Sequence, residues 1–195
     1  ESNIVSLQNI IKFSRKKKLS KFFNFSSFAI YNKNQINILS ITKKIAENII
    51  KNTKINFLNI RLPGVLSYKL SDSRRPWLNY IINQLKKNKN ISIFDKEKKF
   101  NSVIDTYEIF CFLKSQIESK KMKNGTINLL ATQPVQLFKI INLIKEKINS
   151  RSKVFYKKNK SLQNNISHFS INVKKIYKFE VATTGKIIDR FLTNS

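Results

Sequence analysis

Glycine is scarce in this chain, and the places where it occurs constrain the fold more than any other feature. Among 195 residues, glycine is found only at Gly64, Gly125 and Gly185. A phosphate-binding loop of the form G-x-G-x-x-G or G-x-x-x-x-G-K-[ST] needs glycines within a few residues of one another. The sequence therefore excludes both loops.

Cysteine and histidine are equally rare. The chain has one of each, Cys111 and His168, which excludes a Cys/His zinc site and a disulfide within the chain. We therefore expect no metal site and a reducing compartment, the cytoplasm. No stretch reaches 18 apolar residues, so we expect no membrane span. The sequence begins at Glu1 and its only methionine is Met122, which leads us to expect the back part of a longer protein.

The charge is strongly basic, with 38 basic and 11 acidic residues and a net charge of +27. Two interpretations are open. A basic nucleic-acid-binding domain is one. The other is nucleotide bias, because lysine codons are A/T-rich and the chain has 32 lysines against 6 arginines. Phosphate-binding surfaces usually favour the forked guanidinium of arginine. We therefore favour bias, and expect only nonspecific binding to nucleic acid.

Hydrophobic periodicity predicts alternating strands and helices. The expected strands span 21–30, 54–61, 91–94, 98–104, 126–131 and 153–156, and the expected helices span 3–19, 36–51, 76–87, 106–120, 134–149, 172–177 and 183–192. This alternation is typical of an α/β protein with a largely parallel sheet. The polar loop at 66–75 is the expected boundary between a sheet-based core and a smaller lobe.

Polar residues gather where the first strands should end. Ser26-Ser27 follows a hydrophobic strand, Lys43 and Glu47 lie on the next helix, and the second strand ends in the sequence RLPG from Arg61. The carboxyl ends of parallel strands meet at one edge of a sheet, where open α/β sheets bind their ligands. The sequence therefore predicts a ligand site at this edge.

An ordered series of motifs resembles a known family. KFFNFSSFAIY resembles a strand ending in S-S-x-x-x-Y, LSITKKIAE resembles Y-x-x-S-K-x-x-x-E, and RLPGVLS resembles R-x-P-N-V-Y-G. Further along, KKFNSVIDTYEI resembles R-D-F-V-Y-V-D-D, with Lys98 at the Arg and Asp105 at the second Asp, and NGTINLLATQ places Asn128 on a motif Asn. The series resembles the extended short-chain dehydrogenase/reductase family, in its sugar-nucleotide epimerase/dehydratase group.

This resemblance implies a fold and a function. The fold would be the C-terminal half of a Rossmann-like parallel sheet with helices on both faces, plus a small α/β substrate lobe. Residues 1–65 would be the back half of the cofactor domain, and 66–195 mainly the substrate lobe, with 105–131 returning to the sheet. The implied cofactor is NAD or NADP. The implied substrate is a nucleotide sugar, epimerised, dehydrated or reduced in surface polysaccharide synthesis. A homodimer would form through helices 3–19 and 36–51.

The resemblance also implies roles for particular residues. Ser27 would orient the substrate oxygen, and Lys43 would bind the cofactor ribose. The family's catalytic tyrosine position, four residues before Lys43, is Leu39 here. Leucine cannot transfer a proton, so either Tyr31 takes the acid/base role or the chain is an inactive relative that binds a ligand or partner. Pro63 and Gly64 are the further cofactor candidates, and Lys98 and Arg75 the substrate candidates.

Overall fold

The computed structural model describes residues 2–31, 37–67, 76–158 and 173–194. The chain divides into two compact units. The first unit comprises Glu1–Pro63, Cys111–Leu129 and Asn172–Phe179, and the second comprises Gly64–Phe110, Leu130–Ile171 and Glu180–Ser195. The predicted α/β class with parallel strands is confirmed. The roles that we predicted for residues 1–65, 66–195 and 105–131 stay predictions.

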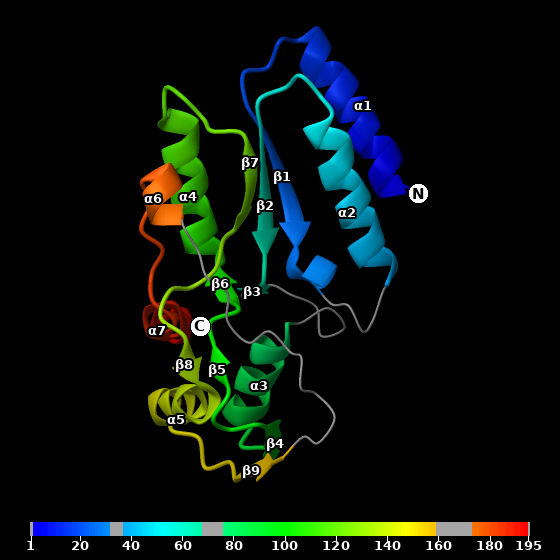
Figure 1. The fold of residues 1–195 in the computed structure, drawn as a ribbon. Helices are drawn as coiled ribbons and strands as arrows, with labels where there is room; N and C mark the ends of the chain where they lie inside the picture. Colours follow the sequence, from blue (N-terminus) through cyan, green and yellow to red (C-terminus); the bar gives the residue numbers. More distant parts are fainter. Residues whose placement is uncertain (1, 32–36, 68–75, 159–172, 195) are drawn as a thin grey trace. The chain divides into compact units, whose positions relative to one another are not determined.

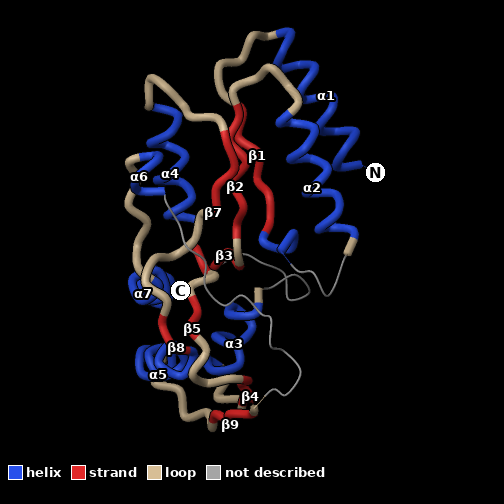
Figure 2. Tube along the Cα trace, viewed as in Figure 1, coloured by secondary structure: helices blue, strands red, loops and turns tan. Residues whose placement is uncertain are grey.

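The first unit is built on a three-stranded parallel sheet. Its strands are β1 (Phe22–Ser27), β2 (Phe57–Leu62) and β7 (Gly125–Asn128), in the order β1-β2-β7. Figure 1 shows α1 (Ser2–Lys16) and α2 (Ile38–Lys51) on one side of this sheet, and α4 (Thr106–Glu118) and α6 (Val173–Tyr177) on the other. All three strands run in the same direction, and the tube in Figure 2 shows them side by side. Helices therefore cover both faces, as predicted.

Two apolar clusters hold these helices to the sheet. Under α1 and α2, the buried side chains are those of Leu7, Ile11, Ala46, Ile50 and Phe57. On the opposite face, Phe112 of α4 is fully buried and packs edge-on against Tyr177 and Phe179, with ring centroids 6.1 and 5.3 Å apart. Burial of such side chains contributes roughly 1.5–3 kcal/mol each.

Lys21 fixes the end of α4. Its ammonium donates to the carbonyls of Gln116, Ile117 and Ser119, at 2.9, 2.6 and 2.6 Å. The last carbonyls of a helix have no partner within the helix, and a cation there also interacts favourably with the helix dipole. One lysine just before β1 therefore ties α4 to the sheet.

The ends of α1 and α2 differ slightly from the predicted ones, for local reasons. Helix α2 begins at Ile38 because Asn37 caps it: the Asn37 side chain accepts from the Ser40 amide at 2.8 Å, and the Ser40 hydroxyl accepts from the Asn37 amide at 3.2 Å. Helix α1 ends at Lys16 because Lys18 adopts a left-handed conformation, φ 51°. Between β1 and α2, Phe28–Tyr31 forms a single 3₁₀ turn, η1.

In the second unit, the described residues form short strands and three helices that lie entirely within it. Strand β3 (Gly64–Leu66) pairs in parallel with β6 (Val103–Asp105), and β4 (Ile91–Phe94) pairs in parallel with β9 (Val154–Lys157). Strands β5 (Lys99–Phe100) and β8 (Val135–Gln136) form an antiparallel pair. The helices are α3 (Trp77–Lys86), α5 (Leu137–Lys147) and α7 (Thr184–Thr193).

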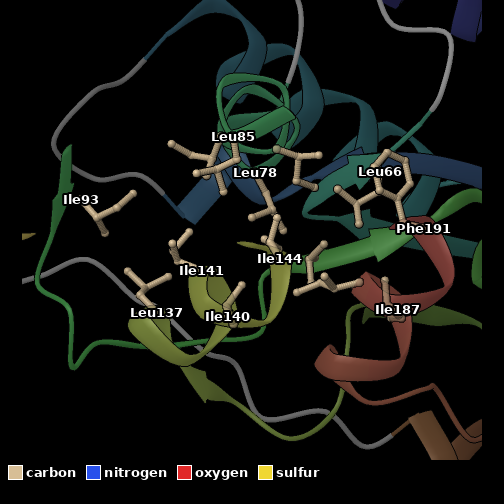
Figure 3. Packing of buried hydrophobic residues seen from close by; sticks show 14 of the residues in the cluster. Leu66, Leu78, Leu85, Ile93, Leu137, Ile140, Ile141, Ile144, Ile187 and Phe191 are labelled. Carbon is tan, nitrogen blue, oxygen red and sulfur yellow. The ribbon is translucent and has the colours of Figure 1, made fainter. Parts of the chain in front are cut away.

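The core of this unit is an apolar cluster, drawn in Figure 3. It joins Leu78 and Leu85 of α3, Ile141 of α5 and Ile187 of α7. All four side chains are at most 3% exposed. Three helices thus share one buried surface, which stabilises a lobe whose strands are too short to do so themselves.

Two predicted elements are longer than those that the structure has. The helix expected from 134 begins at Leu137, because Val135 and Gln136 pair with β5. The strand expected over 126–131 ends at Asn128. Beyond it, the Ala131 amide donates to Val103 of β6, in the second unit, at 2.9 Å. The periodicity of the sequence could not distinguish these tertiary pairings from a continued element.

Candidate functional site

The sheet face that lies under α2 carries polar side chains in rows. Asn24, Asn59 and Thr126 occupy equivalent positions on the three strands. The side-chain amide of Asn24 donates to Asn59 Oδ1 at 2.9 Å, and the side-chain amide of Asn59 donates to Thr126 Oγ1 at 3.3 Å. Asn59 has no exposed surface, so these bonds compensate for its burial.

The next row lies at the carboxyl ends of the strands. It consists of Ser26, Arg61 and Asn128, which the strand register places side by side. Arg61 binds Glu47 of α2 with two bonds, Nε to Oε1 at 2.9 Å and Nη2 to Oε2 at 2.7 Å. The side chains of Arg61 and Glu47 are 22% and 3% exposed. This is a largely buried ion pair with the paired geometry in which arginine binds carboxylates most strongly.

The ion pair sets the charge state of both partners. Burial alone would raise the pKa of Glu47, but the hydrogen bonds and the charge of Arg61 outweigh it and hold that pKa below the ordinary range. The hydrogen bonds to Glu47 also raise the pKa of Arg61. A fixed positive guanidinium therefore stands at the carboxyl edge of the central strand.

Tyr31 completes this group. The last residue of η1, it accepts a hydrogen bond from Arg61 Nη1 at 2.7 Å and donates one to Asn128 Oδ1 at 2.8 Å. Its ring lies edge-on to Phe28, with centroids 5.6 Å apart, and the Arg61 guanidinium carbon is 5.1 Å from its centroid. We refer to Tyr31, Arg61, Glu47 and Asn128 as the carboxyl-edge cluster. It holds a phenol between a cation and a side-chain amide.

The structure also places Ser27, Lys43 and Leu39 near the carboxyl end of β1. The Ser27 hydroxyl accepts from the Ala29 amide at 3.1 Å, which leaves its proton available for donation. The Lys43 ammonium donates to the Phe25 carbonyl at 2.8 Å, so this lysine reaches from α2 to β1. Leu39, one helical turn before it, is 48% exposed. A side chain at position 39 thus has room on the same side of α2 as the ammonium.

The other predicted site residues are distributed along the chain. Pro63 ends the first unit, and Gly64 opens β3 in the second, where an added Cβ would lie 3.2 Å from the Pro76 Cβ. Lys98 lies in a turn, with its amide donating to the Asp95 carbonyl at 2.9 Å. Arg75 lies outside the described residues. The structure tests none of their predicted roles.

Asp105, which the motif series singled out, anchors the second unit. Arg190 Nε donates to Asp105 Oδ2 at 2.8 Å, Arg190 Nη2 donates to Asp105 Oδ1 and to Glu108 Oε1 at 3.0 Å, and the Asp105 carboxylate caps α4 through the Glu108 amide. Burial would lower the pKa of Arg190, but its bonds to the two carboxylates raise it. These contacts give Asp105 a structural part in joining β6, α4 and α7.

The sequence did not predict that Arg61 binds Glu47 and Tyr31. Nor did it predict that Tyr31 binds Asn128. A signal was present, because Glu47 follows Ala46 on the buried face of an amphipathic helix and Arg61 follows four buried residues of β2. A charge in such a position needs a partner. The sequence does not say which charge pairs with which, and the strand register supplies that answer.

Two features are absent from the residues that the structure describes. No group of histidine, cysteine and acidic side chains within them could hold a metal ion. Nor does any helix that the structure describes have the length and apolar character required to cross a membrane.

Comparisons with known proteins bear on the fold. No protein-family model matches the chain, and no curated protein matches it. Among solved structures, UDP-N-acetylglucosamine 4-epimerase from Methanobrevibacter ruminantium, in complex with UDP-N-acetylmuramic acid, is similar with a TM-score of 0.75. It is 16% identical, over 99% of this chain and 69% of that one.

Two further solved structures agree. UDP-glucose 4-epimerase from Thermotoga maritima, with UDP-glucose, has a TM-score of 0.75 and 14% identity, over 98% of this chain and 70% of that one. The dTDP-4-dehydrorhamnose reductase from Bacillus anthracis, in complex with NADP, has a TM-score of 0.77 and 14% identity, over 99% and 72%. These likenesses confirm that the chain has the Rossmann-like fold implied by the resemblance, and at this identity they show the fold alone.

Proposed function

We propose that this chain is part of an NAD(P)-dependent enzyme that epimerises, dehydrates or reduces a nucleotide sugar. The observation that carries the proposal is the carboxyl-edge cluster. It holds a phenol, a cation and an amide together at the edge of a parallel sheet where α/β proteins bind ligands. The similar solved structures, which are nucleotide-sugar epimerases and a reductase, support the same reading. We place the reaction in surface polysaccharide synthesis in the cytoplasm.

The residues present fit the ribose and nicotinamide of NAD(P) but not its pyrophosphate. Lys43 uses one of its three N–H donors on the Phe25 carbonyl and retains two for a ribose hydroxyl. Pro63 and Gly64 would lie beside the nicotinamide. The pyrophosphate end has no glycine-rich cradle within these 195 residues. A cofactor bound here would supply the hydride acceptor or donor.

Protein side chains would carry the proton chemistry. Ser27 would donate a hydrogen bond to the reacting oxygen of the sugar and so orient it. Tyr31 would exchange a proton with that oxygen, with Arg61 holding the phenol in place and Glu47 holding Arg61. General acid/base catalysis of this kind typically contributes about 10²–10⁴-fold. Lys98 and Arg75 would bind the anionic nucleotide part of the substrate.

The test combines binding and turnover. The chain is mixed with NAD or NADP and a panel of UDP- and dTDP-sugars. Saturation-transfer NMR follows sugar binding, and proton NMR follows product. We expect Tyr31→Phe to keep binding and lose turnover, whereas Tyr80→Phe, at an exposed tyrosine of α3, keeps both. We expect Lys43→Gln to weaken cofactor binding and the adjacent Lys44→Gln to leave it unchanged.

The outcome separates this function from its alternatives. Absence of both binding and turnover over the whole panel refutes the proposal. Binding without turnover, in the parent chain and in Leu39→Tyr alike, establishes instead an inactive ligand-binding relative, the candidate that the leucine at position 39 favours.

We also propose that the protein is a homodimer through α1 and α2. Apolar side chains stand exposed on both helices, among them Val5 and Phe13 of α1 and Ile41 and Ile45 of α2. Such surfaces usually mark an interface. Sedimentation velocity should show a dimer that Ile41→Lys/Ile45→Lys dissociates, while Ile117→Lys on α4 does not. A monomer at all concentrations contradicts the proposal.

A further inference from the structure

A groove lies in the first unit at the opposite end of the sheet from the carboxyl-edge cluster, where β1 and β2 begin. It is open to solvent and has a volume of about 620 Å³. The end of α1 contributes Arg15, Lys18 and Leu19 to its walls, and the segment between α2 and β2 contributes Asn52, Lys54 and Ile55. In Figure 1 these two segments lie at the amino ends of the strands, near the top of the first unit.

The groove is positively charged. Arg15, Lys18 and Lys54 are all exposed, and no carboxylate belongs to the lining. Among the described residues, none of these three cations takes part in an ion pair. An adjoining hollow of about 340 Å³ shares Arg15 and Asn52 and adds Lys12. The charges of these three side chains are therefore available to bind an anion.

The helix dipoles oppose this charge only in part. Both α1 and α2 end at the groove, and each C-terminus contributes roughly −0.5 of an elementary charge. Their sum, about −1, leaves the three cations dominant. Because Coulomb energy scales with the charge of the ligand, a group with two negative charges gains more here than a carboxylate does.

Hydrogen bonds hold the two walls together. On the α1 side, the Leu19 amide donates to the Ser14 carbonyl at 3.0 Å. Across the groove, the Phe22 amide donates to the Asn56 carbonyl at 2.9 Å, and the Asn56 side chain donates to the Ser20 carbonyl at 3.4 Å. These hydrogen bonds therefore position the backbone that carries the charged side chains without the help of a ligand.

We infer that this groove binds a phosphate-bearing ligand. Its volume is within the range of about 300–1,000 Å³ that is usual for small-ligand sites. The cations would bind the phosphate, the Asn52 amide would add a neutral donor, and Leu19 and Ile55 would cover an apolar part. The phosphate can come from a free di- or triphosphate or from a nucleic-acid backbone. The inference does not depend on the proposed enzymatic function, whose residues lie at the other end of the sheet.

The test compares two variants with the same loss of charge. Arg15→Gln/Lys18→Gln/Lys54→Gln removes the groove cations. Lys120→Gln/Lys121→Gln/Lys123→Gln removes three exposed lysines from the turn before β7, which lines neither hollow. Inorganic pyrophosphate is titrated by calorimetry at low salt, and a labelled oligothymidylate by fluorescence anisotropy. We expect the groove variant to bind at least one probe about tenfold more weakly, and the control to change by less than about twofold.

Each outcome is decisive. If the groove variant, and not the control, loses only the binding of pyrophosphate, the ligand is a free phosphate compound. If it loses only the binding of oligothymidylate, the ligand is a nucleic-acid backbone. Equal weakening in both variants overturns the inference, because the effect then comes from overall charge. Absence of binding to either probe also overturns it. Lys43→Gln should leave binding in the groove unchanged, which separates this result from the fate of the proposed function.

Discussion

Replacing Arg61 by methionine is expected to destabilise the first unit strongly. Methionine keeps much of the length of the side chain but removes its charge and all three hydrogen bonds to Glu47 and Tyr31. Glu47 would then be left as a carboxylate that is only 3% exposed, with no cation on it. The cost arises mainly from that stranded charge rather than from the lost attraction.

The size of the effect follows from the burial of the pair. Breaking a buried ion pair on one side typically costs about 3–5 kcal/mol. Because the Arg61 side chain is 22% exposed, water screens it in part, and we expect the lower end, about 3 kcal/mol. For a chain of this size that lowers the melting temperature by about 6–12 °C. The double variant Arg61→Met/Glu47→Leu leaves no buried charge and should be more stable than Arg61→Met alone.

Urea unfolding followed by circular dichroism measures these differences, and their pH dependence tests the cause. The pKa of Glu47 is lower in the folded protein than in the unfolded chain, where it is about 4.3. Its contribution to stability is therefore fully present above about pH 4.3 and is lost as the pH falls through the folded value. The gap between wild type and Arg61→Met should shrink over that acidic range. A loss below about 1 kcal/mol, or a double variant as unstable as the single one, would refute this reasoning.

Three further predictions follow from other contacts. The chain should bind NAD weakly, since it lacks a glycine-rich turn for the pyrophosphate; a dissociation constant in the low micromolar range by calorimetry would contradict this. Leu39→Tyr should leave turnover of a nucleotide sugar unchanged, because Tyr31 already supplies the phenol; a gain of about 10²-fold in a product assay would show instead that position 39 is the deficit and that Tyr31 is not the acid/base. Lys21→Met should cost about 1–3 kcal/mol in urea unfolding because three carbonyls at the end of α4 lose a charged donor, whereas a loss near zero would mean that water replaces the ammonium.

The identity of most elements could be predicted from the sequence because their causes are local. Apolar residues alternate or recur with helical spacing within each segment, and caps such as Asp105 at the start of α4 are adjacent to what they cap. The α/β class followed from the order of these segments. Their ends were less predictable, since Val135 and Gln136 become a strand only through partners at Lys99 and Phe100.

The candidate site divides in the same way. Ser27 and Lys43 could be selected from a motif, because short-range spacing fixes their places on a strand end and a helix. That Arg61 binds Glu47 and Tyr31, and that Tyr31 also reaches Asn128, depends on the register of three strands and joins residues up to 97 positions apart. A linear pattern holds no information about such a register. Residue spacing by itself determined which elements form, and only the tertiary structure decided which charges and hydroxyls meet, because buried polar groups take whatever partners the packed sheet brings within bonding distance.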